Sequence, residues 1–170
     1  WLKYDELLSA ADAAGGLQAR AQVEAWLGRN DLFYLLARLL RRADIDNDWL
    51  FARCREVERD RDGFLDLWGR GHYKSTVITF ALTVQEVLRD PNITIGIFSH
   101  TQRIAKAFLK QIKREFEENE LLKVLYPDIL WSDPNRDAPQ WNEDGIIVRR
   151  DANPKEATIE AWGLVDGQPT

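Results

Sequence analysis

The stretch with the clearest chemical potential runs from Leu67 to Thr76 and contains two glycines, an arginine, a lysine and a Ser-Thr pair. It lies between an expected strand and an expected helix, which is the context that phosphate binding needs. Backbone N–H groups of such a loop surround phosphate oxygens, and the helix N-terminus adds partial positive charge. Lys74 would reach the outer phosphates of a nucleotide, and the hydroxyl of Ser75 would coordinate Mg²⁺. The alternative is a glycine-rich turn followed by a surface lysine.

The match to the strict P-loop pattern is partial. That pattern places glycine six residues and one residue before the lysine, where this chain has Trp68 and Tyr73. Arg70, four residues before Lys74, suits phosphate oxygens because its planar guanidinium offers several donors, and it can stabilise charge that develops during phosphoryl transfer. Its alternative role is that of a surface arginine bonded to a neighbouring carboxylate.

The elements that must position this loop alternate between strand and helix from residue 61 onward. The expected strands are Gly63–Trp68, Asn92–Phe98, Gly145–Arg149 and Ala157–Trp162. The expected helices are Lys74–Leu88, Gln102–Asn119 and a turn at Glu120–Leu125, with a loop over Ser132–Pro139. This alternation is typical of an α/β fold with a parallel sheet.

The first sixty residues are instead expected to be helical, as an N-terminal helical segment at residues 1–60. The expected helices are Trp1–Ala14, Leu17–Leu27, Leu32–Ala43 and Trp49–Glu58. Gly15-Gly16 and Gly28 end the first two helices, and Asp31 and either Asn47 or Asp48 are suited to cap the next two.

Composition excludes several classes of protein. The chain of 170 residues is 45% hydrophobic and 30% charged, as in folded globular proteins. A net charge of −5 excludes a general electrostatic binder of nucleic acid, although local basic patches remain open. The single cysteine, Cys54, excludes an intrachain disulfide and is interpreted as a small apolar helix residue. No apolar run approaches the roughly 20 residues that span a bilayer, so we expect a soluble protein.

The segment Asp66–Thr76 resembles the deviant Walker A segment of large terminase subunits, the DNA-packaging ATPases of tailed phages. That family often has an arginine four residues before the lysine, as Arg70 is here, and it tolerates other residues where strict P-loops have glycine. The resemblance covers about residues 30–170. It includes a lead-in helix at Asp48–Val57, a second strand and helix at Ile95–Lys106, and a strand and glycine loop at Ala157–Thr170.

The resemblance implies a P-loop NTPase-type parallel sheet, incomplete because the Walker B strand is absent, within a partial ATPase core at residues 61–170. It implies ATP and Mg²⁺ as cofactors and catalytic roles for Lys74 and Arg70, with Arg70 sensing the γ-phosphate. Ser75 would hold Mg²⁺, with Thr76 as a helper. Backbone contacts to the phosphates are implied for Gly69, Gly71, His72 and Tyr73.

The implied function is ATP binding in a viral DNA-packaging motor, which couples hydrolysis to translocation of double-stranded DNA into a procapsid. The implied partners are double-stranded DNA, the small terminase subunit, the portal of the procapsid and other copies of the chain in a ring, in the host cytoplasm and with no membrane. Another nucleic-acid-dependent P-loop ATPase, such as a helicase or translocase, is the alternative. A non-enzymatic helical module or prophage remnant with an inert loop also stays open.

We also expect the chain to be part of a longer protein. It contains no methionine, even at position 1, and it ends where terminases place the Walker B acids. The terminase nuclease domain is absent as well. We therefore expect this piece to bind nucleotide weakly at best and to lack packaging activity by itself.

Four further features each have a structural and a functional interpretation. Ser99, His100 and Thr101 follow the second strand and either lie near the nucleotide or simply form a turn and a helix cap. Arg149-Arg150 either ends a strand or supplies charge to a neighbouring subunit's ATP. The seven tryptophans either anchor the core, which is the interpretation we favour, or stack on bases. A basic stripe, which either touches a DNA backbone or is an ordinary solvated helix face, comprises Arg103, Lys106, Lys110, Lys113 and Arg114.

Overall fold

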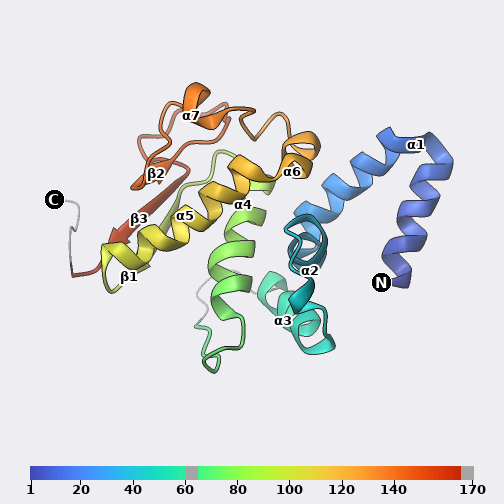
Figure 1. Cartoon of the computed structure of the whole chain (residues 1–170), viewed down its shortest axis with the longest axis horizontal. Helices are drawn as coiled ribbons and strands as arrows, with labels where there is room; N and C mark the ends of the chain where they lie inside the picture. The colour runs from blue at the N-terminus through green and yellow to red at the C-terminus, as the bar shows by residue number, and fades with distance from the viewer. Residues whose placement is uncertain (60–64, 166–170) are drawn as a thin grey trace.

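The computed structural model describes residues 1–59 and 65–165 and has a mixed α/β architecture rich in helix (Figure 1). The helical elements are α1 (Leu2–Asn30), α2 (Leu32–Tyr34), the π-helical η1 (Leu35–Leu39), the 3₁₀ turn η2 (Ala43–Ile45), α3 (Asp48–Arg59), the π-helical η3 (Ser75–Leu82), α4 (Thr83–Arg89), α5 (Gln102–Glu118), α6 (Glu120–Leu125) and α7 (Pro134–Asp137). The strands are β1 (Ile95–Ser99), β2 (Gly145–Ile146) and β3 (Ile159–Gly163).

The strands of the described residues form one mixed sheet in the order β1–β3–β2. β1 and β3 are parallel, with Ile97 opposite Ala161, and α5 packs against both. β2 runs antiparallel to β3, with Ile146 opposite Ile159, so the expectation of an all-parallel sheet is wrong. The chain passes from β2 to β3 through a loop with no crossover helix, and parallel strands require such a crossover.

β1 and β3 begin and end within three residues of the expected Asn92–Phe98 and Ala157–Trp162, but the other two expected strands are missing or reduced to two residues. Gly63 and Phe64 lie outside the described residues, and Leu65–Trp68 forms no strand. The ring of Trp68 packs against Trp49 of α3, and the backbone of Leu65–Trp68 does not pair with the sheet. The strand expected at Gly145–Arg149 keeps only its first two residues, because Ile147 and Arg149 donate their backbone N–H groups to loop carbonyls rather than to β3.

α5 and α6 follow the sequence pattern, and the helices before β1 depart from it at their ends. The loop expected at Ser132–Pro139 instead contains the short helix α7, which Pro134 begins. α5 and α6 match their expected ranges to within one residue. The helix expected over Leu32–Ala43 ends at Leu39 because Arg41 adopts a left-handed backbone with φ of 56°. Such a residue typically terminates a helix. The helix expected over Lys74–Leu88 is present as η3 followed without a break by α4.

The long helix α1 is bent at Gly15-Gly16, as its two arms in Figure 1 show. Gly16 has φ of 62°, which favours glycine and separates the two expected helices. Gly28 does not end the helix but lies inside it, where a β-carbon would collide with the Tyr126 hydroxyl. No helix in the described parts of the chain is long and apolar enough to cross a membrane.

A continuous hydrophobic cluster links the N-terminal helices to the strand-containing region. It includes Leu32 and Leu50 from one side of residue 60 and Val84, Leu109 and Ile159 from the other. The division at residue 60 stays a prediction, but the described residues on its two sides share one core.

A buried carboxylate, Asp31, joins α1, α2 and α3. Its side chain caps α2 by accepting a hydrogen bond from the Tyr34 backbone N–H at 3.0 Å. It also accepts hydrogen bonds from the Tyr4 hydroxyl at 2.6 Å and from the Arg55 guanidinium. Because these bonds replace the water lost on burial, Asp31 is stable there only as long as its donors remain in place.

Glu58 forms the second half of this polar network. Its Oε1 accepts from the Leu32 backbone N–H at 2.8 Å, from Gln85 Nε2 at 3.0 Å and from Arg89 at 3.3 Å. Its Oε2 lies 3.3 Å from Arg55, the cation that also binds Asp31. The network therefore connects the start of α2 and the end of α3 to α4, the continuation of the helix that follows the glycine loop.

We expect Asp31→Ala to lower the free energy of unfolding by about 2–3 kcal/mol, because it removes a helix cap and leaves buried donors without an acceptor. The measurement is urea denaturation followed by circular dichroism. Asp12→Ala is the matched control, because Asp12 pairs with Arg20 on the exposed part of α1. We expect about 0.5 kcal/mol or less for the control. Equal losses in the two variants would contradict a structural role for the network.

Candidate functional site

The candidate phosphate loop, Gly69–Lys74, forms a tight turn that leads directly into η3. The His72 N–H donates to the Gly69 carbonyl at 3.3 Å, and the Val77 N–H donates to the Tyr73 carbonyl at 2.9 Å. Gly71 has φ of 81°, a conformation that glycine adopts at no steric cost. The expected loop-to-helix junction is therefore present, although the described residues before it do not form a strand.

Tyr73 adopts the backbone conformation that glycine usually supplies at the position before the lysine. Its φ is 62°, which is uncommon for a residue with a β-carbon and costs about 1–3 kcal/mol. Its side chain is half-buried and packs against the hydrophobic core, which offsets that strain. The departure from the strict pattern thus changes the residue but keeps a left-handed backbone.

Tyr73 also lies close to an ion pair of the preceding region. Arg42 donates from Nε and one terminal nitrogen to the two carboxylate oxygens of Asp44, both at 2.9 Å. These hydrogen bonds, with a smaller contribution from Tyr73, lower the pKa of Asp44 to about 2. The turn η2 is therefore a direct neighbour of the loop, a relation that sequence spacing does not reveal.

The residues expected to act on phosphate are exposed and available. Arg70, Lys74 and Ser75 are all exposed. Within residues 1–59 and 65–165, neither Arg70 nor Lys74 forms an ion pair, so the alternative of an arginine bonded to a carboxylate finds no support there. The loop borders an open hollow of about 570 Å³. The hollow is lined by Trp68 and by all the expected site residues, which are Gly69, Arg70, Gly71, His72, Tyr73, Lys74, Ser75 and Thr76.

An aromatic cluster flanks the loop and was not anticipated from the sequence. Trp49 of α3 contacts Trp68 with ring centroids 5.6 Å apart and His72 with centroids 5.7 Å apart. None of the seven tryptophans is fully buried. Trp68 and Trp141 pack against the hydrophobic core, as their interpretation as core anchors requires, whereas Trp1, Trp26 and Trp49 are exposed. The available signal was the position of Trp68 and His72 at the two sides of the Gly-x-Gly turn.

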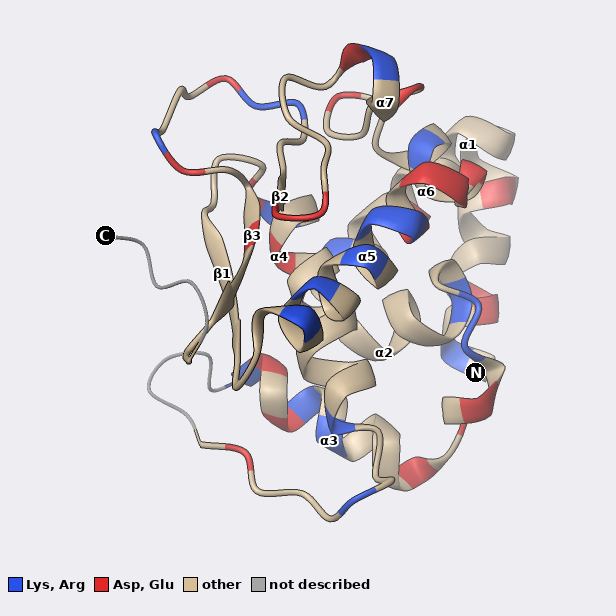
Figure 2. Ribbon diagram, turned by 60° about the vertical axis from the view of Figure 1, so that its left-hand side comes forward, with Lys and Arg blue, Asp and Glu red and all other residues tan. Residues whose placement is uncertain are grey.

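Three of the five residues of the basic stripe of α5 pair with neighbouring acids, whereas Arg103 and Lys110 form no ion pair in the described residues. Lys106 lies 2.9 Å from Glu143 and 2.8 Å from Asp144, and Arg114 lies 2.9 Å from Glu118. Figure 2 shows these charges of both signs mingled along and beside α5. The arrangement favours a solvated helix face over a continuous cationic track for a DNA backbone.

The two arginines after β2 are occupied within the chain. Arg149 stacks over the Trp131 ring at 4.9 Å and donates to the Pro127 carbonyl. Arg150 donates to the carbonyls of Pro154 and Glu156. Both therefore hold loops in place. The expectation that they end a strand is wrong, because β2 ends at Ile146, and the intersubunit role stays a prediction.

The residues after β1 organise the end of the sheet. The carbonyls of Ser99 and His100 accept hydrogen bonds from the N–H groups of Leu164 and Val165. Thr101 occupies the cap position of α5, but its side chain makes no capping hydrogen bond. No hydrogen bond or ring contact in the described parts of the chain joins these three residues to the loop.

Cys54 is fully buried, and burial raises the pKa of its thiol to about 12. This fits its interpretation as a small apolar helix residue, because the reactive thiolate is disfavoured. Within the described residues, no group of three or more His, Cys, Asp or Glu side chains is arranged to hold a metal ion.

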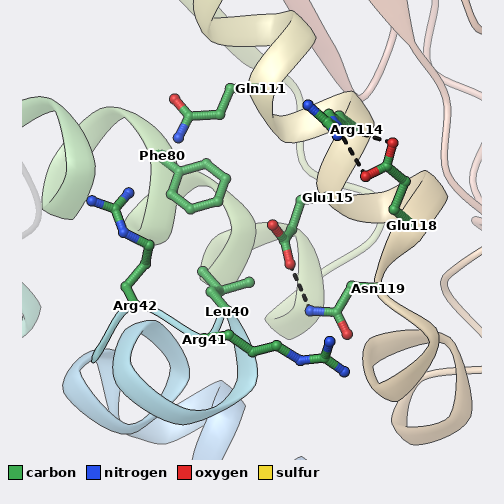
Figure 3. Close-up of a pocket in the computed structure, with 9 residues that line it drawn as sticks. All are labelled: Leu40, Arg41, Arg42, Phe80, Gln111, Arg114, Glu115, Glu118 and Asn119. Carbon is green, nitrogen blue, oxygen red and sulfur yellow. Dashed lines mark hydrogen bonds and ion pairs between the residues drawn. The ribbon is translucent and has the colours of Figure 1, made fainter. Parts of the chain in front are cut away.

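A second hollow, of about 300 Å³, lies between the end of η1 and α5 (Figure 3). Glu115 points into it, and the Asn119 amide donates to Glu115 at 2.6 Å. Burial raises the pKa of Glu115, while the Asn119 hydrogen bond and the Arg41 charge act in the opposite direction. The hollow contains opposite charges in similar number and does not single out a ligand.

No protein-family model, curated protein or solved structure matches this chain.

We expect Glu115 to make the protein less stable as the pH rises above about 4. The folded pKa of Glu115 lies above its ordinary value, so the folded state holds the proton more tightly than the unfolded chain, and stability falls as the pH passes from the unfolded to the folded pKa. Glu115→Gln should remove this loss, since its amide oxygen still accepts from Asn119.

The measurement compares urea denaturation of the wild type and Glu115→Gln between about pH 4 and pH 7. Glu6→Gln, at an exposed position of α1, controls for the change in net charge. Parallel pH profiles for the wild type and Glu115→Gln would contradict the assignment.

Proposed function

We propose that this chain binds the phosphates of Mg-ATP at Gly69–Thr76 and is the ATP-binding part of a viral DNA-packaging motor of the large terminase type. The observation that carries the phosphate-binding part is the junction itself. Gly71 and Tyr73 turn the backbone with positive φ, and Lys74, which forms no ion pair with residues 1–59 or 65–165, then stands at the start of a helix. A backbone turn followed by a helix N-terminus favours anions.

The exposed side chains of Lys74 and Arg70 would supply the full positive charges that the backbone turn lacks. Lys74 would neutralise the β and γ phosphates, and Arg70, four residues earlier, would bind the γ-phosphate and the charge that develops on it during transfer. Because neither side chain is engaged by a carboxylate of the described residues, nucleotide binding would not have to break an existing ion pair.

The loop offers Mg²⁺ only a small number of protein ligands, as is usual for this ion in nucleotide sites. Ser75 is exposed at the first position of η3, where its hydroxyl can coordinate a cation beside the phosphates. Mg²⁺ in nucleotide sites typically keeps several waters and takes one or two protein ligands together with phosphate oxygens. When bound, the ion would neutralise phosphate charge, and Thr76 would support the Ser75 hydroxyl.

The choice of a packaging motor rests on the resemblance of Asp66–Thr76 to the terminase Walker A segment. A terminase motor would work as a ring of copies at the portal of a procapsid in the host cytoplasm, with the small terminase subunit and double-stranded DNA as partners. A helicase or another translocase would use the same loop, and the arginine at Arg70 favours the terminase.

We expect Lys74→Ala to weaken Mg-ATP binding by about 10- to 100-fold, because it removes a charge-assisted hydrogen bond to phosphate. Isothermal titration calorimetry measures the affinity, and the rise in melting temperature with Mg-ATP gives an independent readout. Lys110→Ala is the matched control, because Lys110 is an exposed lysine of α5 with no ion pair in the described residues. Wild type that shows neither heat nor thermal shift with Mg-ATP would defeat the proposal.

We expect Gly71→Ala to reduce both stability and nucleotide affinity, whereas Gly16→Ala should reduce stability alone. Both glycines have positive φ, and at both a β-carbon would meet no atom within 4 Å, so each substitution costs about 1 kcal/mol through the backbone only. Urea denaturation compares the stabilities, and calorimetry with Mg-ATP compares the affinities. Equal affinities of the two variants for Mg-ATP would show that Gly71 does not contribute to nucleotide binding.

A further inference from the structure

We propose that Trp49, Trp68 and His72 form a stacking surface for the base of the nucleotide whose phosphates the loop binds. This inference rests on the proposed function and adds to it the part of the ligand that the phosphate loop leaves unrecognised. It assigns a role to Trp49, a residue of α3 that lies outside the loop in sequence and beside it in space.

The three rings meet edge to face. Trp49 is inclined by 70° to Trp68 and by 67° to His72, with centroids 5.6 Å and 5.7 Å apart. In such pairs one ring presents its edge to the face of the other, so some ring faces of the cluster are not covered by another ring. Trp49 is 45% exposed and His72 is exposed, which leaves aromatic surface open to a ligand.

The cluster is held in place before any ligand arrives. The Trp68 indole donates from Nε1 to the Asp66 carboxylate at 3.1 Å. His72 Nδ1 lies 3.1 Å from the Arg70 carbonyl, and its ring lies so close to Gly69 that a β-carbon there would be 2.7 Å from Nδ1. Such anchoring lowers the entropy lost when a base stacks.

Two members of the cluster line the hollow of the phosphate loop, and Trp49 packs against both of them. Trp68 and His72 line the same space as Lys74 and Ser75, and its volume of about 570 Å³ lies within the roughly 300–1,000 Å³ that small-molecule and cofactor sites occupy. A polyphosphate held by Lys74 therefore has an aromatic wall within the same hollow, where a base is the chemical group that fits.

The recognition is expected to be by stacking rather than by hydrogen bonds to the base edge. The indole nitrogen of Trp68 and Nδ1 of His72 already have partners within the loop region. Every base offers a π-face, so stacking tolerates different bases. We therefore expect the site to distinguish nucleotides from inorganic polyphosphate and to bind Mg-ATP and Mg-GTP with similar affinity.

The experiment compares Mg-ATP with Mg-tripolyphosphate, which carries the phosphates without a base, by calorimetry on the whole chain. Wild type should bind Mg-ATP on the order of tenfold more tightly, the lower part of the range for stacking on one aromatic surface. Trp49→Ala should remove most of this preference and leave tripolyphosphate binding unchanged, and Trp49→Phe should keep most of it. Trp131→Ala, which alters a tryptophan packed with Arg149 in another part of the chain, should change neither affinity.

The outcomes separate this inference from the proposed function. Equal affinity for Mg-ATP and Mg-tripolyphosphate, or an undiminished preference in Trp49→Ala, overturns the stacking surface and leaves the phosphate loop standing. Binding of neither compound overturns the phosphate loop and the stacking surface together. If Trp49→Ala fails to fold by circular dichroism, His72→Ala carries the test, because His72 is exposed, and retention of the full preference by that variant overturns the inference.

Discussion

Two carboxylates, the buried Asp31 and the partly buried Glu58, hold the helices in the arrangement on which the rest of the structure depends. They bind a shared cation, Arg55, and backbone N–H groups at the start of α2. Glu58 also binds Gln85 and Arg89 of α4. A charge without water is tolerated only where every donor is in place, so the network favours one relative position of α3 and α4 over others.

That position determines what surrounds the candidate loop. α3 supplies Trp49, and α4 continues η3, whose first residues follow the loop. The ends of α1 and α4 are further joined by reciprocal bonds, in which Arg29 donates to the Leu88 carbonyl and Arg89 to the Arg29 carbonyl. A helix that is fixed at its end by polar contacts and along its length by the core presents its N-terminus, and thus Lys74, at a defined place.

The strained backbone of the loop is maintained by the same packing. Tyr73 has a left-handed φ that its side chain disfavours, yet its ring packs against the core and lies near the Arg42–Asp44 pair. A local cost of this kind persists where the surroundings over-determine the conformation. Packing of the Tyr73 side chain against the core therefore compensates for a backbone conformation that glycine adopts more easily.

Local patterns were predictable where a residue's effect is confined to its own neighbourhood. Asp31 as the α2 cap, the break at Gly15-Gly16, the helix after Lys74 and the amphipathic helix α5 all follow from side chains acting on adjacent backbone. The absence of a strand at Leu65–Trp68 and the antiparallel direction of β2 could not be predicted from local patterns, because strand pairing depends on which segments meet in space. A run with strand-like composition forms a strand only when a neighbour accepts its hydrogen bonds.

The sequence by itself determined the break at Gly15-Gly16 and the Asp31 cap of α2, and it singled out Gly69–Thr76 as the candidate for phosphate binding. Only the tertiary structure decided that Arg70 and Lys74 stay unpaired among the described residues, that Arg149 and Arg150 are engaged within the chain, and that Trp49 lies beside the loop. The physical reason is distance along the chain. Caps and turns act over a few residues, whereas ion pairs and ring contacts join residues whose separation in sequence says nothing about their separation in space.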